Sequence, residues 1–280
     1  MAMALPRFPN KRKMIWLAAL IVAANGFLPV LWILLTSVKT ETELMRLPIT
    51  ILPAAPTLQN YVRVFTDQPI HLFLWNSFAV AVLSTALCIT VSALAAYALV
   101  RLRLPAPGLI LSVLLAIAMF PLISLVVPLF QTMRSLELLN TWPALILPYA
   151  VLSMPVCTMV LVSFFQDIPN DLENAAMIDG CTRVGALWHV VIPLTAPGVF
   201  TAAILAFVNC WDEFLLALTL SSRVVKRTLP VGITLYQGEF AFPWPIISAA
   251  LIVAIVPVSI LIAVFQDRVV GGLTSGGMKG

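Results

Sequence analysis

The sequence has few charged residues for its length. Of 280 residues, 10% are charged and 61% are hydrophobic, whereas a soluble domain is about 25% charged and about 45–50% apolar. One water-soluble core cannot hide so much apolar side chain, which excludes a soluble enzyme and a disordered chain. The net charge is only +4 and no basic run carries interleaved aromatics, so nucleic acid is not expected as a partner. The chain is predicted to be an all-α, polytopic membrane protein.

Residues that could build a metal or phosphate site are also scarce. The four cysteines show no Cys-x-x-Cys spacing and the two histidines lie in separate segments, so no zinc or haem site is expected. The cysteines are predicted to be reduced thiols that pack as small hydrophobic side chains. The glycine-rich stretch from Gly271 to Gly280 lacks the Gly-Lys-Ser/Thr order of a phosphate-binding loop. No catalytic residue, metal or cofactor is therefore assigned to this chain.

Six segments are long and apolar enough to cross a bilayer, which takes roughly 20 apolar residues. They are residues 14–38, 75–100, 109–131, 143–165, 198–220 and 246–266. The first is interpreted as an uncleaved anchor, because its apolar run is long for a cleavable signal peptide. Six prolines fall inside these segments, namely Pro29, Pro121, Pro128, Pro148, Pro155 and Pro257. Kinks rather than breaks are expected there, since neighbouring helices can satisfy the freed backbone groups.

These spans predict the organisation of the chain. It comprises a cytoplasmic N-terminus (1–13), a first transmembrane helix (14–38), an extracytoplasmic loop (39–74), a five-helix core (75–266) that includes an inner loop (166–197), and a cytoplasmic tail (267–280). Both termini are placed in the cytoplasm because basic residues precede the first span, which usually dominates topology. The whole-chain bias in Lys and Arg supports the same orientation only weakly, with nine inside and seven outside.

The inner loop is acidic and has the pattern of two short helices around a glycine turn. Pro169 predicts a helix start and Gly180 its end, while Thr182 can cap a second helix that Pro193 ends. One face of the first helix would carry Leu172, Ala175, Ala176 and Asp179. An acidic loop favours a protein contact over anionic lipid, although an ordinary connector between spans would also fit.

The loop resembles the EAA motif of permease subunits in bacterial binding-protein-dependent ABC importers. The motif reads Glu-Ala-Ala, three residues, Gly, nine residues and Ile-x-Leu-Pro. The matching residues are Ala175, Ala176, Gly180 and Pro193. Asn174 occupies the position of the motif's Glu, and Glu173 comes one place earlier. The segment 211–214 and the C-terminal tail are similar to the carbohydrate branch, the maltose- and trehalose-type (MalG-like) subunits, which usually have Asn at the position of Asp212.

This resemblance implies a MetI-like fold of type I ABC permeases with six transmembrane helices, in the bacterial inner membrane. It implies import of a di- or oligosaccharide or related polyol by alternating access. The implied partners are a homologous permease subunit, normally forming a heterodimer, a dimeric cytoplasmic ATPase, an extracytoplasmic solute-binding protein and the lipid bilayer. ATP and Mg would bind the ATPase, so this chain is expected not to be an enzyme.

The resemblance also implies that the inner loop forms a coupling helix, which docks in a groove of the ATPase. The residues assigned to this contact are Glu173, Asn174, Ala175, Ala176, Asp179, Gly180 and Arg183. The C-terminal glycine-rich tail would be a flexible end or a second contact with the ATPase.

An acidic pair inside the fifth predicted span is the candidate for the solute pathway. Asp212 and Glu213 lie about 21–22 Å along the span from Gly198, at 1.5 Å per residue, and intramembrane ionisable groups are functional candidates. Carboxylates, amides and aromatic rings suit a sugar. The candidate residues are Asn209, Trp211, Asp212 and Glu213, with Tyr97 and Asn76 as weaker ones. A polar contact between helices or subunits is equally open.

Two other classes of protein remain to be compared. An ion-driven secondary transporter would use Asp212 and Glu213 as its coupling site, but it would also predict a repeat between the halves of the chain, and none is seen. A membrane-embedded enzyme would need a spaced constellation of His, Ser or Asp that the spans lack.

Overall fold

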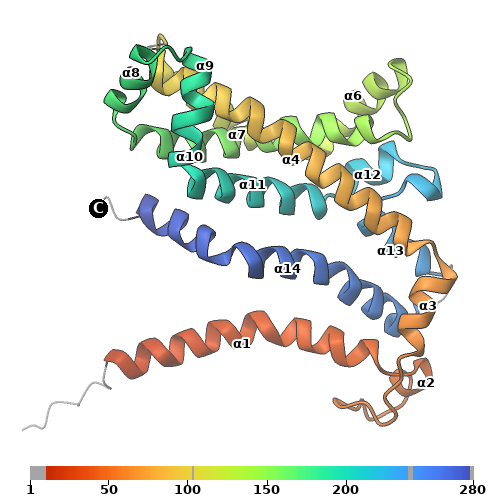
Figure 1. The fold of residues 1–280 in the computed structure, drawn as a ribbon. Helices are drawn as coiled ribbons and strands as arrows, with labels where there is room; N and C mark the ends of the chain where they lie inside the picture. Colours follow the sequence, from red (N-terminus) through yellow and green to blue (C-terminus); the bar gives the residue numbers. More distant parts are fainter. Residues whose placement is uncertain (1–10, 103, 239–241, 278–280) are drawn as a thin grey trace, which may run out of the picture. The chain divides into compact units, whose positions relative to one another are not determined.

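The computed structural model describes residues 11–102, 104–238 and 242–277, and all regular elements in these ranges are helices (Figure 1). Two compact units are formed by the described parts of residues 1–68 with 235–253 and of residues 69–234 with 254–280. Most of the predicted cytoplasmic N-terminus lies outside the described residues, as do the last three residues of the predicted tail. The rest of that tail continues helix α14 (Trp244–Gly277).

Among the described residues, four helices are long and apolar enough to cross a membrane. They are Arg12–Ser37 within α1 (Lys11–Ser37), α4 (Ile70–Arg101), α7 (Trp142–Gln166) and Trp244–Phe265 within α14. Two bent helix pairs pass the same test, Pro107–Ala118 with Leu122–Ser135 and Arg183–Leu194 with Ala196–Trp211. The described residues therefore hold up to six spans when each bent pair is counted as one.

The third predicted span is broken rather than kinked, which corrects the expectation for Pro121. Helices α5 (Pro107–Ala118) and α6 (Leu122–Ser135) meet at an angle of 88°. Pro121 has no N–H to continue the helix and disfavours helical backbone at the preceding Phe120. The other five prolines in predicted spans lie inside continuous helices.

The fifth predicted span is also interrupted. Helix α11 (Ala196–Trp211) ends before Asp212, and α12 (Leu215–Leu220) adds only six residues. The Glu213 carboxylate accepts hydrogen bonds from the backbone N–H groups of Leu216 and Ala217, at 2.8 and 3.1 Å. This local side-chain cap satisfies donors at the start of α12, so it favours a new helix over continuation of α11.

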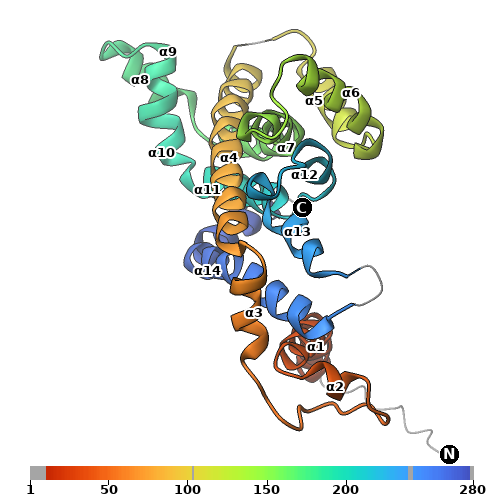
Figure 2. The same cartoon turned by 90° about the vertical axis from the view of Figure 1, so that its right-hand side faces the viewer.

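The core of the larger unit is built by α4, α7 and α11, which lie side by side (Figures 1 and 2). Small side chains such as Ala96, Ala150 and Ala202 are fully buried there. Helix α11 approaches α7 so closely at Gly198 that an added Cβ would lie 2.3 Å from the Phe164 ring. Alanine and glycine thus allow close helix packing, as in other membrane proteins.

The remaining elements of this unit are α8 (Asn170–Ile178), α9 (Arg183–Ala186), the π-helical turn Leu187–Val191, α10 (Ile192–Leu194), the 3-10 turn Val224–Lys226 and α13 (Leu229–Ile233).

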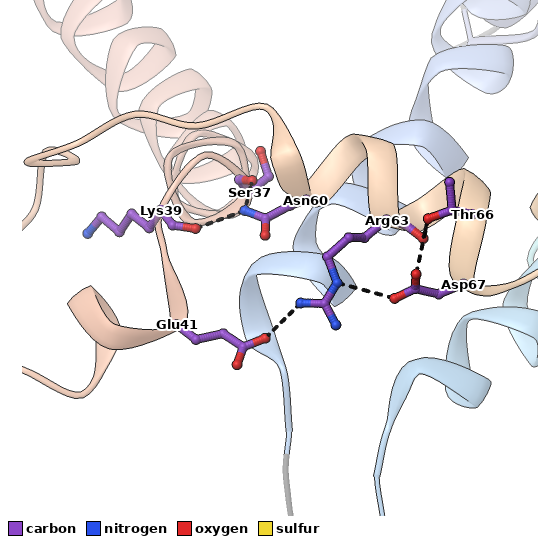
Figure 3. A network of polar contacts seen from close by, with 7 residues as sticks. All are labelled: Ser37, Lys39, Glu41, Asn60, Arg63, Thr66 and Asp67. Atoms are coloured by element: carbon purple, nitrogen blue, oxygen red, sulfur yellow. Dashed lines mark hydrogen bonds and ion pairs between the residues drawn. The ribbon is translucent and has the colours of Figure 1, made fainter.

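The smaller unit includes α2 (Glu41–Leu44), α3 (Gln59–Asp67) and the described part of residues 235–253, which begins within the 3-10 turn Thr234–Tyr236. Its polar contacts tie α3 to the end of α1 (Figure 3). The Asn60 amide donates to the carbonyls of Ser37 and Lys39, both at 2.8 Å. On the neighbouring turn Arg63 pairs with Glu41 and Asp67. The loop after α1 is therefore held in a defined conformation.

This loop is predicted to loosen in acid. The backbone N–H of Ala54, the Thr50 hydroxyl and the Lys39 ammonium lower the pKa of Glu43 below its ordinary value of 4.5. Because the pKa of Glu43 is lower in the folded than in the unfolded chain, its ionised carboxylate contributes its full stabilisation of the loop above the unfolded pKa. This stabilisation is lost as the pH falls through the folded pKa. Amide exchange of residues 39–58, corrected for the intrinsic effect of pH, should rise below pH 4.5 in the wild type. A Glu43→Gln variant should lack this acid step, and an equal step in both would refute the assignment.

Candidate functional sites

The inner loop folds as two helices around a left-handed glycine. Gly180 has φ +96°, the Cys181 N–H donates to the Ala176 carbonyl at 2.9 Å, and the Gly180 N–H donates to the Met177 carbonyl at 3.1 Å. This pair of hydrogen bonds is the Schellman motif that closes helix ends. Thr182 caps α9 by accepting the N–H of Gly185 at 3.1 Å. The predicted helix end at Gly180 and the predicted cap at Thr182 are both confirmed.

One face of α8 is exposed together with the turn that follows. Most residues assigned to ATPase docking lie on this surface, namely Asn174, Ala175, Asp179 and Gly180, and Ala176 is half-buried beside them. Arg183 is exposed after the turn, at the start of α9. Ile178 is 86% exposed and Leu172 46%. We call the exposed residues 172, 174, 175 and 178–181 the coupling surface. Its small and apolar side chains would allow close approach of another protein.

Glu173 lies on the opposite face of α8 and is buried. Its carboxylate accepts a hydrogen bond from Arg101 Nε at 2.5 Å, and only 5% of the Glu173 side chain and 11% of the Arg101 side chain are exposed. The structure thus places Glu173 away from the coupling surface, so any effect on docking would be through the position of α8.

Arg101 connects three elements of the larger unit. It is the last residue of α4, it pairs with Glu173 in the first turn of α8, and its Nη2 donates to the carbonyls of Phe165 and Ile168 at 3.1 and 2.8 Å. These carbonyls belong to the C-terminal end of α7 and the link to α8, where acceptors lack helical partners. The guanidinium therefore anchors the inner loop to the ends of both core helices.

A polar cleft of about 470 Å³ lies between α8 and the end of α4. Its lining includes Tyr97, Arg101, Glu173, Asn174 and Arg183. Tyr97, which the sequence suggested for the solute pathway, is therefore in the cleft beside the inner loop.

A second cavity, of about 220 Å³, lies where the two broken spans meet. Ile117, Ala118, Phe120 and Leu122 line it from the α5–α6 bend, and Asn209, Cys210 and Glu213 line it from the end of α11. Helix α7 contributes Tyr149, Leu152 and Ser153. One wall is thus apolar and the other carries hydroxyl, amide and carboxylate groups. Membrane transporters commonly place solute sites at such helix breaks.

Two of the four main pathway candidates, which lie on the last turn of α11 and directly after it, reach this cavity. Asn209 Nδ2 donates to Ser153 Oγ at 3.3 Å, and Glu213 accepts the Tyr149 hydroxyl at 2.5 Å. Trp211 is buried against Phe207, with ring centroids 5.8 Å apart, and Asp212 is exposed beside the break. Glu213 already accepts hydrogen bonds from the Tyr149 hydroxyl and from two backbone N–H groups. Its carboxylate therefore stabilises the backbone between α11 and α12, which leaves it less available to a solute.

Asn76 is separate from both sites. Its amide donates to the carbonyls of Val225 and Arg227 and accepts from Trp142 Nε1 at 3.1 Å. These contacts fasten the loop after α12 to α4 and α7.

Several residues of these sites were missed or undervalued by sequence reasoning. Arg101 entered only the charge count, and Ser153 and Cys210 looked like ordinary residues of a span. A cation at the end of a predicted span, facing an acidic loop, was the available signal for Arg101. The meeting of Ser153 with Asn209, 56 residues apart, left no local signal.

Comparison with known proteins gives concordant matches. One family, described as "Binding-protein-dependent transport system inner membrane component", matches residues 89–274. The chain is 66% identical to the sulfoquinovosyl glycerol transport system permease protein SmoH of Agrobacterium fabrum, covering 99% of this chain and 97% of that protein. It is 40% identical to the trehalose transport system permease protein SugB of Mycobacterium tuberculosis, covering 93% and 95%. A chain of a bacterial alginate ABC transporter has the same fold, with a TM-score of 0.76 and 20% identity over 94% of this chain and 99% of that chain.

Proposed function

The chain belongs to the family of binding-protein-dependent transport system inner membrane components, and we propose that it forms half of a translocation pathway for a sugar or glycoside. As a member of this family it is a permease subunit of an ABC importer, which confirms the expectation that it is not an enzyme and that it works with a binding protein. The ion-driven alternative is not supported. The match with SmoH along almost the entire chain carries the proposed solute class.

The proposed solute route passes the cavity at the two helix breaks. Its polar wall offers the Asn209 amide and the Ser153 hydroxyl, groups that exchange hydrogen bonds with sugar hydroxyls. A volume of about 220 Å³ is smaller than the roughly 300–1,000 Å³ of most ligand pockets. This supports a site completed by a second, homologous permease subunit. Asp212, exposed beside the break, would then face the shared pathway, with Trp211 supporting it from within.

Asn209→Ala is predicted to raise the apparent KM for the solute about tenfold, equivalent to about 1.4 kcal/mol for a lost hydrogen bond. Cys210→Ala, at the adjacent cavity position, is the control and should change it little, because a thiol is a weak hydrogen-bonding group. The measurement is initial uptake rate against solute concentration. Equal KM values for both variants would remove Asn209 from the route.

The coupling surface is proposed to dock on a cytoplasmic ATPase dimer, which would hold ATP and Mg. Its exposed apolar and small residues next to a rigid turn support this role, because a closed helix end transmits displacement better than a flexible loop. Both termini and the inner loop are accordingly proposed to lie in the cytoplasm, as six spans and the basic N-terminus favour.

The proposed function is tested by reconstituting the assembled transporter in liposomes. Uptake of a labelled glycoside such as sulfoquinovosyl glycerol, or of trehalose, should require ATP on the side of the ATPase and the binding protein on the other. It should persist when ionophores abolish ion gradients. Uptake driven by an ion gradient without ATP would refute the proposal.

A further inference from the structure

The loop after α1 presents an unusual set of exposed apolar side chains. Met45, Leu47, Ile49, Ile51 and Leu52 are each 65–87% exposed. We call residues 45–52 the apolar loop. It contains no acidic residue, and its one charge is Arg46. Large exposed apolar patches mark contacts with protein or membrane.

The apolar loop is ordered by contacts at its base. Glu43 accepts hydrogen bonds from the Thr50 hydroxyl at 2.8 Å and from the Ala54 N–H at 2.9 Å. The Thr57 N–H donates to the Val38 carbonyl at 2.8 Å, and Asn60 fastens the residues at the end of α1 to α3 (Figure 3). The apolar side chains thus project from a held backbone rather than from a freely moving strand.

Lys39 shows in which direction the loop extends. The residue is only 1% exposed, its Nζ lies 5.4 Å from the centroid of the Trp32 ring, and the same Nζ donates to the Thr50 carbonyl. Trp32 precedes Ser37, the last residue of α1, by five residues, which is roughly 7.5 Å along a helix. The Lys39 ammonium therefore connects the apolar loop to Trp32, more than one turn before the C-terminal end of α1. The loop thus folds back alongside the last turns of this helix, at the level of Trp32.

The length of α1 and the position of Trp32 favour placing this level at the membrane interface. Helix α1 has 27 residues, about 40 Å at 1.5 Å per residue, and so exceeds a hydrocarbon core of about 30 Å. A helix of this length reaches past the hydrocarbon core, and Trp32 near its C-terminal end is of the residue type that is enriched at the membrane interface. Interfacial segments combine apolar side chains with basic ones, which is the composition of the apolar loop.

From these observations we infer that the apolar loop is a lipid-binding element, whose side chains enter the leaflet next to the C-terminal end of α1. The backbone remains in the interfacial layer, where its polar groups can be satisfied by water, Lys39 and Glu43, and Arg46 contacts lipid phosphates. The loop would fix the depth of α1 and of the adjoining α2–α3 segment. This inference is independent of the solute and of ATPase docking.

The test measures the depth of a nitroxide spin label at position 51 in the assembled transporter in lipid nanodiscs. A Cys181→Ser background removes the exposed native thiol, while Cys88, Cys157 and Cys210 are buried. Ile51→Cys carries the label, and Gln59→Cys, exposed at the start of α3, is the matched control. Molecular oxygen should relax the label more strongly than a water-soluble nickel chelate at position 51, and the order should reverse at position 59.

Three results would overturn the inference. Stronger relaxation by nickel at position 51 would place the apolar loop in water. Weak relaxation by both reagents would show that a protein, such as the second permease subunit, covers it. If relaxation of the label at position 51 by nickel becomes weak only after the binding protein is added, the apolar loop is a docking site for that protein.

Discussion

A Gly180→Arg variant is expected to lose ATP-dependent uptake about 100-fold while the subunit still inserts in the membrane. Disrupting the centre of a docking contact commonly costs about 2–4 kcal/mol, and about 2.7 kcal/mol corresponds to this factor. An added Cβ at position 180 meets no atom within 4 Å, so the arginine would extend outward across the coupling surface. The measurements are uptake in reconstituted vesicles and retention of the ATPase during purification.

The controls separate docking from backbone strain. Gly180 adopts φ +96°, a region that costs other residues roughly 1–2 kcal/mol, with asparagine among the best tolerated. Gly180→Asn should therefore keep most uptake, and Gly180→Ala should be intermediate. If the arginine variant transports at the wild-type rate, or if all three variants fail alike, the docking assignment is wrong.

Removing one partner of the Arg101–Glu173 pair is expected to destabilise the larger unit by about 3–5 kcal/mol, since a buried charge is left without its partner. Arg101→Met should show this loss in thermal unfolding of the purified assembly, together with weak coupling of ATP hydrolysis to uptake. Glu41→Ala, which breaks the half-exposed pair with Arg63, is the control and should cost at most about 1 kcal/mol.

Two double variants make this prediction sharper. Arg101→Met with Glu173→Met should be more stable than Arg101→Met alone, because no buried charge remains. The exchange of Arg101→Glu with Glu173→Arg should fail even though opposite charges are kept, because a carboxylate at position 101 cannot donate to the Phe165 and Ile168 carbonyls. Recovery of full stability by the exchange would show that opposite charges alone hold the inner loop in place.

The sequence predicts this fold well wherever the membrane itself imposes the pattern. The predicted spans 14–38 and 143–165 end within about three residues of α1 and α7, because helix length and apolar composition follow bilayer thickness. The turn at Gly180 was equally readable, since glycine tolerates the left-handed conformation that a Schellman motif needs.

Other features depend on long-range contacts that no local pattern reveals. Pro121 looks like the prolines inside α7, yet the chain turns by 88° beside Pro121, whereas α7 continues past Pro148 and Pro155. Glu213 looked like a solute ligand, but its position lets it cap α12 and accept the Tyr149 hydroxyl. Glu173 looked like a docking residue, and its burial against Arg101, 72 residues away, became visible only when α4 and α8 were placed together.

The native cysteines allow the most direct test of the central claim, that the coupling surface docks on a separate ATPase. Cys181 is exposed next to Gly180, whereas the other three cysteines are buried. In the unmutated permease, a water-soluble maleimide should label Cys181 in the absence of the ATPase and should label it far more slowly in the complete assembly. Equal labelling rates with and without the ATPase, in every nucleotide state, would contradict the account.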